Sequence, residues 1–594
     1  MFSERTIRYV NRQKLFDSIK KKERNIKMKQ IQPKINWLNM VSASSIRNFM
    51  LDDPCIDYYK YYNIGQNLTD DIHTEYILKN GIQFEKDEMI EIKKKHVVVK
   101  VAEHTDSRNK AKFNETIQLM KKGVPIIYQG VLHDYENKTY GLPDLLVRSD
   151  YINTLMGYEV ITDEEARIVS PKLNTLWHYK VIDIKCSTIP LKVDGIHVSN
   201  SDGMPVYKGQ LYIYTMALNK VMGLDLKKGF IWGRRYDTGG DMIHNNMNKL
   251  GVVIYEDSLI TKVYDACKWL RDMRKEGYKW QLLPTPSRTE LYPNMKNHKD
   301  GKWNQVKKIY SNMYNEITSV WNCSYESRMN AHKKGIYSYM DPKCTATAMG
   351  FNDTKIASTI DMILDINRQN VDIIRPSKIM YDRSNWITEN ENTLAAYLDY
   401  ETIMTKDNKS YIFMIGIGYE LNKKWMYKNF TMMQLNDISE KNIFDNFNSY
   451  VSQILTKMNK QCIKYYHWSC AEPVQYRKFI NKIANQIVPI NNISKFYDLS
   501  KVFICEPIVI KGAFTYSLKS IAKALYNMGL INTVWSTDSA CSNGLNAMVL
   551  ALELYNNLDV NQLIVDNSIM KEIISYNEVD CKTMYEILSL IQQF

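Results

Sequence analysis

The stretch YGLPDLLVRSD, residues 140–150, places an acid between a turn and an apolar run. A Gly-Leu-Pro sequence favours a turn, and the Leu-Leu-Val that follows the acid is typical of a buried strand. Asp144 therefore stands where a buried strand begins, a position at which an unpaired carboxylate is costly. By itself the stretch also fits an ordinary solvated turn, so its meaning depends on the rest of the chain.

A second acid interrupts the apolar run HYKVIDIKCS, residues 178–187. Side chains alternate between the two faces of a strand, so Asp183 and Lys185 point to the same face. A lone D-x-K is also compatible with a structural ion pair. If this strand pairs with the one that begins at Asp144, two carboxylates and an ammonium meet at one place, where they can hold a divalent cation and position a water.

The order Pro143-Asp144 followed by Asp183-Ile184-Lys185 resembles the PD-(D/E)XK nucleases. The resemblance implies that Asp144 and Asp183 bind metal, which would neutralise the acid at the start of the strand. It also implies that Lys185 acts on the attacking water or on the charged transition state.

Three further stretches resemble, in order, the RecB-like branch of these nucleases. Residues 42–62 resemble its N-terminal helix, and GIQFEKDEM supplies Glu85 as a further metal ligand. QLYIY supplies Gln210 and Tyr214, which lie four residues apart and so on one face of a helix. The resemblance implies that this pair brackets the catalytic strand.

A second set of acids lies near the end of the chain. AAYLDYETI places Asp399 and Glu401 on one face of a predicted strand, which is also compatible with a solvated strand edge. SYNEVDCKTMYEIL predicts a helix with Tyr576 and Asp580 on one face, also compatible with a core tyrosine beside an exposed acid. Together the two motifs resemble the first and last motifs of the DEDD exonucleases, tyrosine subclass, which have an RNase H-like fold.

Between these motifs the resemblance implies another acid. Glu472, which opens a predicted helix after a strand, is the expected ligand, and Asp498 is the alternative. The implied chemistry uses two Mg²⁺ or Mn²⁺ ions about 4 Å apart. It assigns Asp399 as the bridging ligand, Glu401 and Asp580 as further ligands, and Tyr576 to the attacking water. Oxygen ligands favour these metals over zinc.

The length of 594 residues exceeds what one hydrophobic core supports. The net charge of +13 fits a polyanionic partner, although a merely basic protein would have the same charge. The ten cysteines include no C-x-x-C pair, which indicates reduced thiols rather than a zinc site. No uncharged apolar run is long enough for a membrane span or a signal peptide, which predicts an intracellular protein of the cytoplasm or, for a viral chain, of the host nucleus.

The predicted fold class is a multidomain α/β protein. Its segments are a basic N-terminal arm over residues 1–35, a PD-(D/E)XK restriction-endonuclease-like domain over 36–290, a helical connector over 291–385 and an RNase H-like exonuclease domain over 390–594.

The pair of modules resembles the two-nuclease proteins of bacteria and large DNA viruses. It implies a metal-dependent nuclease that acts on DNA single strands or ends in repair, recombination or replication. No Walker A sequence is present, so a helicase would act in trans. The alternatives are an RNA-processing exonuclease, since metal sites do not select the sugar, and a nucleic-acid-binding scaffold with one inactive site. The complete sets of acids favour the enzyme.

Overall fold

The computed structural model describes residues 37–65, 68, 70, 72–201, 203–239, 242–243, 249–352, 354–369, 371–376, 391–405, 409–483, 494–536, 544–557 and 563–593. The predicted basic arm, residues 1–35, lies outside them. The chain forms two compact units that divide between Tyr314 and Asn315, with Asp71–Thr74 grouped with the second. Both units contain mixed sheets and helices, so the predicted α/β class is confirmed.

The first unit is built on a seven-stranded sheet in the order β10-β8-β7-β6-β3-β2, with β9 paired to β8. β6 runs antiparallel to β7, with Leu145 opposite Ile182, so the residues just before β6 lie beside Asp183. A smaller sheet has the order β1-β5-β4. The strands are β1 (Val41–Ser42), β2 (Val98–Lys100), β3 (Ile126–Tyr128), β4 (Leu132–Asp134), β5 (Thr139–Gly141), β6 (Leu145–Arg148), β7 (Tyr179–Pro190), β8 (Lys228–Asp237), β9 (Met242–Ile243) and β10 (Gly251–Ile254).

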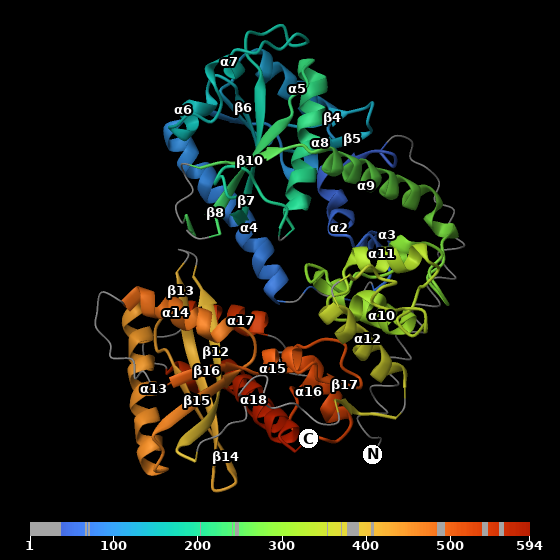
Figure 1. Cartoon of the computed structure of the whole chain (residues 1–594). Coiled ribbons are helices and arrows are strands. Elements are labelled where there is room, and N and C mark those ends of the chain that lie inside the picture. The colour runs from blue at the N-terminus through green and yellow to red at the C-terminus, as the bar shows by residue number, and fades with distance from the viewer. Residues whose placement is uncertain are drawn as a thin grey trace. The chain divides into compact units, whose positions relative to one another are not determined.

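Helices cover both faces of this sheet, and their order can be followed in Figure 1. Tyr179 and Val181 of β7 share a core with α8, whereas Ile182 and Ile184 belong to a second core with residues of α4 and α6. Asp183 has the alternation of Val181 and therefore belongs to the α8 face. The helices are α2 (Arg47–Met50), α3 (Cys55–Tyr61), α4 (Ile72–Lys95), α5 (Lys110–Lys121), α6 (Ile152–Met156), α7 (Asp163–Ala166), α8 (Met204–Met222), α9 (Asp257–Glu276) and α10 (Asn304–Tyr314).

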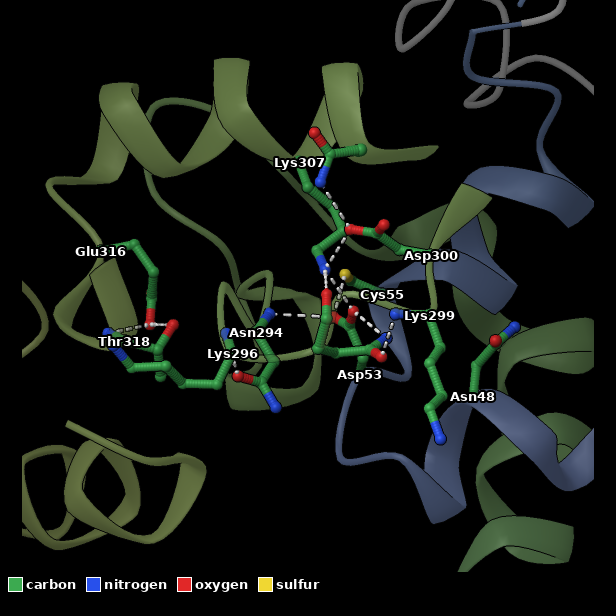
Figure 2. A network of polar contacts seen from close by, with 12 residues as sticks. Asn48, Asp53, Cys55, Asn294, Lys296, Lys299, Asp300, Lys307, Glu316 and Thr318 are labelled. Atoms are coloured by element: carbon green, nitrogen blue, oxygen red, sulfur yellow. Dashed lines mark hydrogen bonds and ion pairs between the residues drawn. The ribbon is translucent and has the colours of Figure 1, made fainter. Parts of the chain in front are cut away.

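A buried polar network ties the last part of this unit to its first helices (Figure 2). The ammonium of Lys307 on α10 lies 2.7 Å from the carboxylate of Asp53 and 2.8 Å from that of Asp300. The backbone N–H of Asn294 donates to Asp53 at 2.8 Å. The predicted helical connector, residues 291–385, is thus divided: its first part is packed into the first unit and the remainder belongs to the second.

The second unit has a five-stranded sheet in the order β14-β13-β12-β15-β16 and a two-stranded sheet of β11 and β17. The central strand β12 is antiparallel to β13 and parallel to β15. The strands are β11 (Ile374–Arg375), β12 (Thr393–Met404), β13 (Ser410–Leu421), β14 (Lys424–Thr431), β15 (Cys462–His467), β16 (Ser494–Asp498) and β17 (Val509–Ile510). The helices are α11 (Tyr325–Lys333), α12 (Thr354–Arg368), α13 (Asp437–Lys457), α14 (Ala471–Ile483), α15 (Leu499–Cys505), α16 (Leu518–Asn527), α17 (Gly544–Asn557) and α18 (Ser568–Ile591).

Among the residues that the structure describes, no helix combines the length and the apolar character required to cross a bilayer.

Candidate metal centres

The first candidate centre lies where β6 meets β7. The register brings the predicted Asp144 and Asp183 together, and the backbone N–H of Ile184 donates to the Asp144 carboxylate at 2.7 Å. The ammonium of Lys185 lies 2.6 Å from the carboxylate of Asp183, whose side chain is only 1% exposed. The strand pairing expected from the sequence is present, and it joins both acids and the lysine.

Charge in this centre is only partly balanced. Burial raises the pKa of Asp144 well above its usual range, and the nearby charge of Asp183 raises it further. Burial opposes the charged form of Lys185, but the carboxylates of Asp183 and Asp144 raise the pKa of its ammonium above the ordinary value. The lysine thus stays protonated while Asp144 still lacks a sufficient counter-charge. A hard divalent cation would supply the counter-charge that the ionised form of Asp144 requires here.

Glu85 reaches the same centre from α4. Its carboxylate accepts hydrogen bonds from the Tyr128 hydroxyl at 2.9 Å and from the Gln129 side-chain amide at 3.1 Å. The backbone N–H of Gln129 donates to the carbonyl of Asp144 at 2.9 Å. Gln129 therefore links two of the predicted ligands, a role that the sequence analysis missed. It has a φ of 53°, which is uncommon for a residue other than glycine.

A cavity of about 500 Å³ opens at this centre. Five of the six residues that the sequence assigns to it line the cavity: Glu85, Asp144, Lys185, Gln210 and Tyr214. The amide of Gln210 donates to the hydroxyl of Tyr214 at 2.8 Å. A Cβ atom on Gly141 would lie 2.2 Å from the Tyr214 ring, so this glycine is required for the ring to approach the turn before Asp144. Gly141, Leu142 and Asp144 of this turn thus line the cavity.

The second candidate centre joins β12 and α18. Asp399 and Glu401 of β12 and Asp580 of α18 offer ligand atoms that all lie within 4.8 Å of one another. β12 and α18 are in direct contact. The two motifs identified at either end of this unit in the sequence are therefore brought together in space.

Burial raises the pKa values of all three acids, and the charge of Asp580 adds to the effect on Asp399 and Glu401. Burial raises the pKa of Glu401 to about 8, and the charge of Asp580 adds to the effect. Burial raises the pKa of Asp580 to about 7, although the charge of Lys519 opposes the shift. The pKa of Asp399 is also raised well above its usual range by burial and by both other carboxylates. Such repulsion is relieved by a bound cation, and three carboxylates suit Mg²⁺ or Mn²⁺.

A buried asparagine holds Asp399 in place. The amide of Asn577 donates to the Asp399 carboxylate at 2.6 Å and accepts from the Tyr427 hydroxyl at 2.8 Å. Gly416 makes room for it, since a Cβ there would lie 1.6 Å from the asparagine oxygen. The sequence analysis did not single out Asn577. The sequence feature that could have identified it is its position as a polar residue on the apolar stripe of α18, four positions before the buried Cys581.

Tyr576 lies at the same centre, as predicted. Its side chain forms a hydrogen bond with Asp580 that lowers the pKa of that acid. The ammonium of Lys519, on α16, lies 4.9 Å from the centre of the Tyr576 ring. Lys519 is a further residue of this centre that the sequence analysis did not identify.

The two candidates for the remaining acid have different surroundings. Glu472 is buried in the first turn of α14, with its carboxylate 3.2 Å from Nδ1 of His467. Its charge contributes to the raised pKa values of Asp399, Glu401 and Asp580. Asp498 caps α15: its carboxylate accepts from the backbone N–H of Ser500 and of Ser469, both at 2.9 Å. The assignment of Glu472 as a ligand stays a prediction.

No protein-family model matches this chain, and no curated protein matches it.

Proposed function

We propose that this protein is a divalent-metal-dependent nuclease with two separate active sites, which hydrolyses phosphodiester bonds of DNA. The observation that carries the proposal is the convergence of Asp399, Glu401 and Asp580 within 4.8 Å beside a tyrosine. The acids and lysine at the junction of β6 and β7 support a second site of the same chemical class.

The donor sets fit the metal. Bound Mg²⁺ or Mn²⁺ would supply Lewis-acid stabilisation of the phosphate oxygens and lower the pKa of a water molecule. In the second unit Asp399, Glu401 and Asp580 would hold it, and in the first unit Glu85, Asp144 and Asp183 would do so.

In the second unit the remaining residues orient the reactants. Asn577 fixes the Asp399 carboxylate through a 2.6 Å hydrogen bond and is itself fixed by Tyr427. Tyr576, which forms a hydrogen bond with Asp580, would orient the attacking water through its hydroxyl. Since orientation and proton placement lower the barrier only when the groups are fixed, this packed arrangement suits hydrolysis.

In the first unit Lys185 is the principal polar group besides the acids. Its ammonium remains protonated, because neighbouring carboxylates raise its pKa. It is therefore suited to stabilise negative charge that develops on the phosphate, rather than to accept a proton. Gln210 and Tyr214 bound the cavity and limit the positions that a substrate strand can occupy.

The test uses the full-length chain with end-labelled single-stranded DNA, double-stranded DNA and RNA, each in Mg²⁺, Mn²⁺ and EDTA. We expect metal-dependent hydrolysis of DNA that is lost in an Asp183→Ala, Asp399→Ala double variant. Hydrolysis that survives in the double variant would come from another source. If the wild-type chain hydrolyses none of the substrates in either metal, the proposal is wrong. Faster hydrolysis of RNA than of DNA would assign RNA as the substrate.

A further inference from the structure

We infer that Lys519 forms an anion subsite of the second centre, where it binds a phosphate group of the nucleic-acid strand. The inference rests on the proposed function and adds to it a substrate-binding residue outside the predicted set of acids and tyrosine. It is argued from the position of the lysine, its aromatic contacts and its charge.

Lys519 is held at the start of a helix beside the acids. Ser517 caps α16 by accepting from the backbone N–H of Ser520 at 3.2 Å, which places Lys519 in the first turn. Its ammonium lies 4.9 Å from the centre of the Tyr576 ring and 5.4 Å from that of the Trp535 ring. Two aromatic rings thus restrict a side chain that is otherwise among the most flexible.

The charge of this lysine acts directly on the metal-binding acids. It lowers the pKa of both Glu401 and Asp580, against the larger effect of burial. A cation that interacts with two carboxylates from different elements lies close to the point where they converge. Lys519 as a whole residue is only partly buried.

A site of clustered carboxylates repels the phosphate that it must receive. Asp399, Glu401 and Asp580 offer ligand atoms that lie within 4.8 Å of one another, so their ionised forms would repel a phosphate at this point. A fixed ammonium next to them offsets the repulsion and gives a strand phosphate a charge-assisted partner. The contact with the Tyr576 ring keeps the ammonium next to the residue proposed to orient water.

The competing explanation is that Lys519 only supports the two aromatic rings. In that case its loss would disturb Tyr576 and slow turnover, while binding of the strand would be little changed. If Lys519 binds a phosphate, its loss should instead weaken binding and raise KM, with a smaller effect on kcat. The distinction can be measured.

The experiment compares Lys519→Met, Lys519→Arg and Lys523→Met in the full-length chain carrying Asp183→Ala, which silences the first site. Lys523 is the matched control, because it is exposed and lies one turn further along α16. Steady-state kinetics are measured on single-stranded DNA in Mg²⁺. Binding of a labelled tetradeoxynucleotide is measured in EDTA by fluorescence anisotropy, at several salt concentrations.

We expect Lys519→Met to raise both KM and the Kd in EDTA by about tenfold or more, as the loss of a charge-assisted contact predicts. The slope of log affinity against log salt should fall by about 0.7, the value for one phosphate contact of a single strand. Lys519→Arg should restore most of the affinity, and Lys523→Met should leave it unchanged.

Unchanged KM and Kd in Lys519→Met, or an equal loss in Lys523→Met, would overturn the inference. If Lys519→Met fails to fold, Lys519→Gln decides the question in the same assays, since it removes the charge and keeps a polar side chain. If the Asp183→Ala parent with intact Lys519 shows no hydrolysis, the proposed function of this site fails. The Kd measured in EDTA still tests whether Lys519 binds a phosphate.

Discussion

The two candidate centres hold buried acids in different ways. In the first, Lys185 lies 2.6 Å from Asp183 and supplies a cation inside the site. In the second, Asp399, Glu401 and Asp580 face one another, and the lysine that acts on them lies beside aromatic rings. A buried carboxylate needs a partner, so the first centre carries part of its own compensation whereas the second depends more on what it binds.

The largest expected effect is the separate loss of each activity. Asp183→Ala should abolish hydrolysis by the first unit and leave that of the second, and Asp399→Ala should do the reverse. Because metal assistance contributes several kcal/mol, each loss should be about a thousandfold or greater. The measurement is hydrolysis of end-labelled oligonucleotides, analysed by product length. Loss of both activities from one substitution in a folded chain would contradict two independent sites.

The next effect concerns the internal cation. Lys185→Met should lower turnover by the first unit about a hundredfold or more, with little change in substrate affinity, because the ammonium is assigned to developing charge. It should also destabilise the first unit by about 3 to 5 kcal/mol, since Asp183 is left buried without its cation. Rates and thermal unfolding are compared with Lys192→Met, which removes a half-exposed lysine. A stable variant with weakened binding alone would place Lys185 in a substrate groove instead.

A smaller effect separates the two candidate acids of the second centre. Glu472→Gln should lower its activity about 10- to 100-fold with little loss of stability, whether the residue binds the metal or supports a ligand. Asp498→Ala should spare most of the activity and cost about 1 kcal/mol, because it removes the cap of α15. Steady-state kinetics and chemical denaturation of both variants show which substitution lowers activity more and which lowers stability more. The reverse order would assign Asp498 to the metal.

The last effect is a dependence of stability on pH in metal-free protein. The pKa of Glu401 is raised by burial from 4.5 to about 8, so the folded state binds this proton more tightly than the unfolded state. Its contribution to stability is complete below pH 4.5 and is lost as the pH rises toward 8. The melting temperature of the second unit in EDTA should therefore fall over this range, by about 2 to 4 °C for each kcal/mol.

Added Mg²⁺ should restore this stability, and by more at pH 8 than at pH 6, because more of the acids are then ionised. Calorimetry of Glu401→Gln should give a flatter dependence on pH, whereas Glu553→Gln, an exposed acid on α17, should leave the dependence as it is. A melting temperature that rises from pH 5 to pH 8 in EDTA would show that the second centre already contains sufficient positive charge.

Much of the fold could be predicted because its signals are local. The strand patterns identified β7 and β12 within a few residues of their ends, and the spacing of Tyr576 and Asp580 placed them on one helical face. The residues that were missed act through distant partners. Gln129, Asn577 and Lys519 are ordinary in their local sequence, and only the folded chain shows what they contact.

The boundary between the units was difficult for the same reason. In the sequence Lys307 is one more lysine of a polar helix, and nothing near it marks it as buried. Its partner Asp53 is contributed by the beginning of the unit. A boundary drawn at residue 290 from the change in composition therefore separates residues 291–314 from the unit into which they pack.

The link between Asp53 and Lys307 also has a consequence for folding of the protein during its synthesis on the ribosome. Asn294, which donates to Asp53, is 241 residues further along the chain. At synthesis rates of about 5 to 20 residues per second, Asp53 is made about 10 to 50 s before its partners. During that time the first helices have no buried cation to pack against. We expect the first unit to complete its packing only when residues near 310 have emerged, so the segment after its seven-stranded sheet is added last.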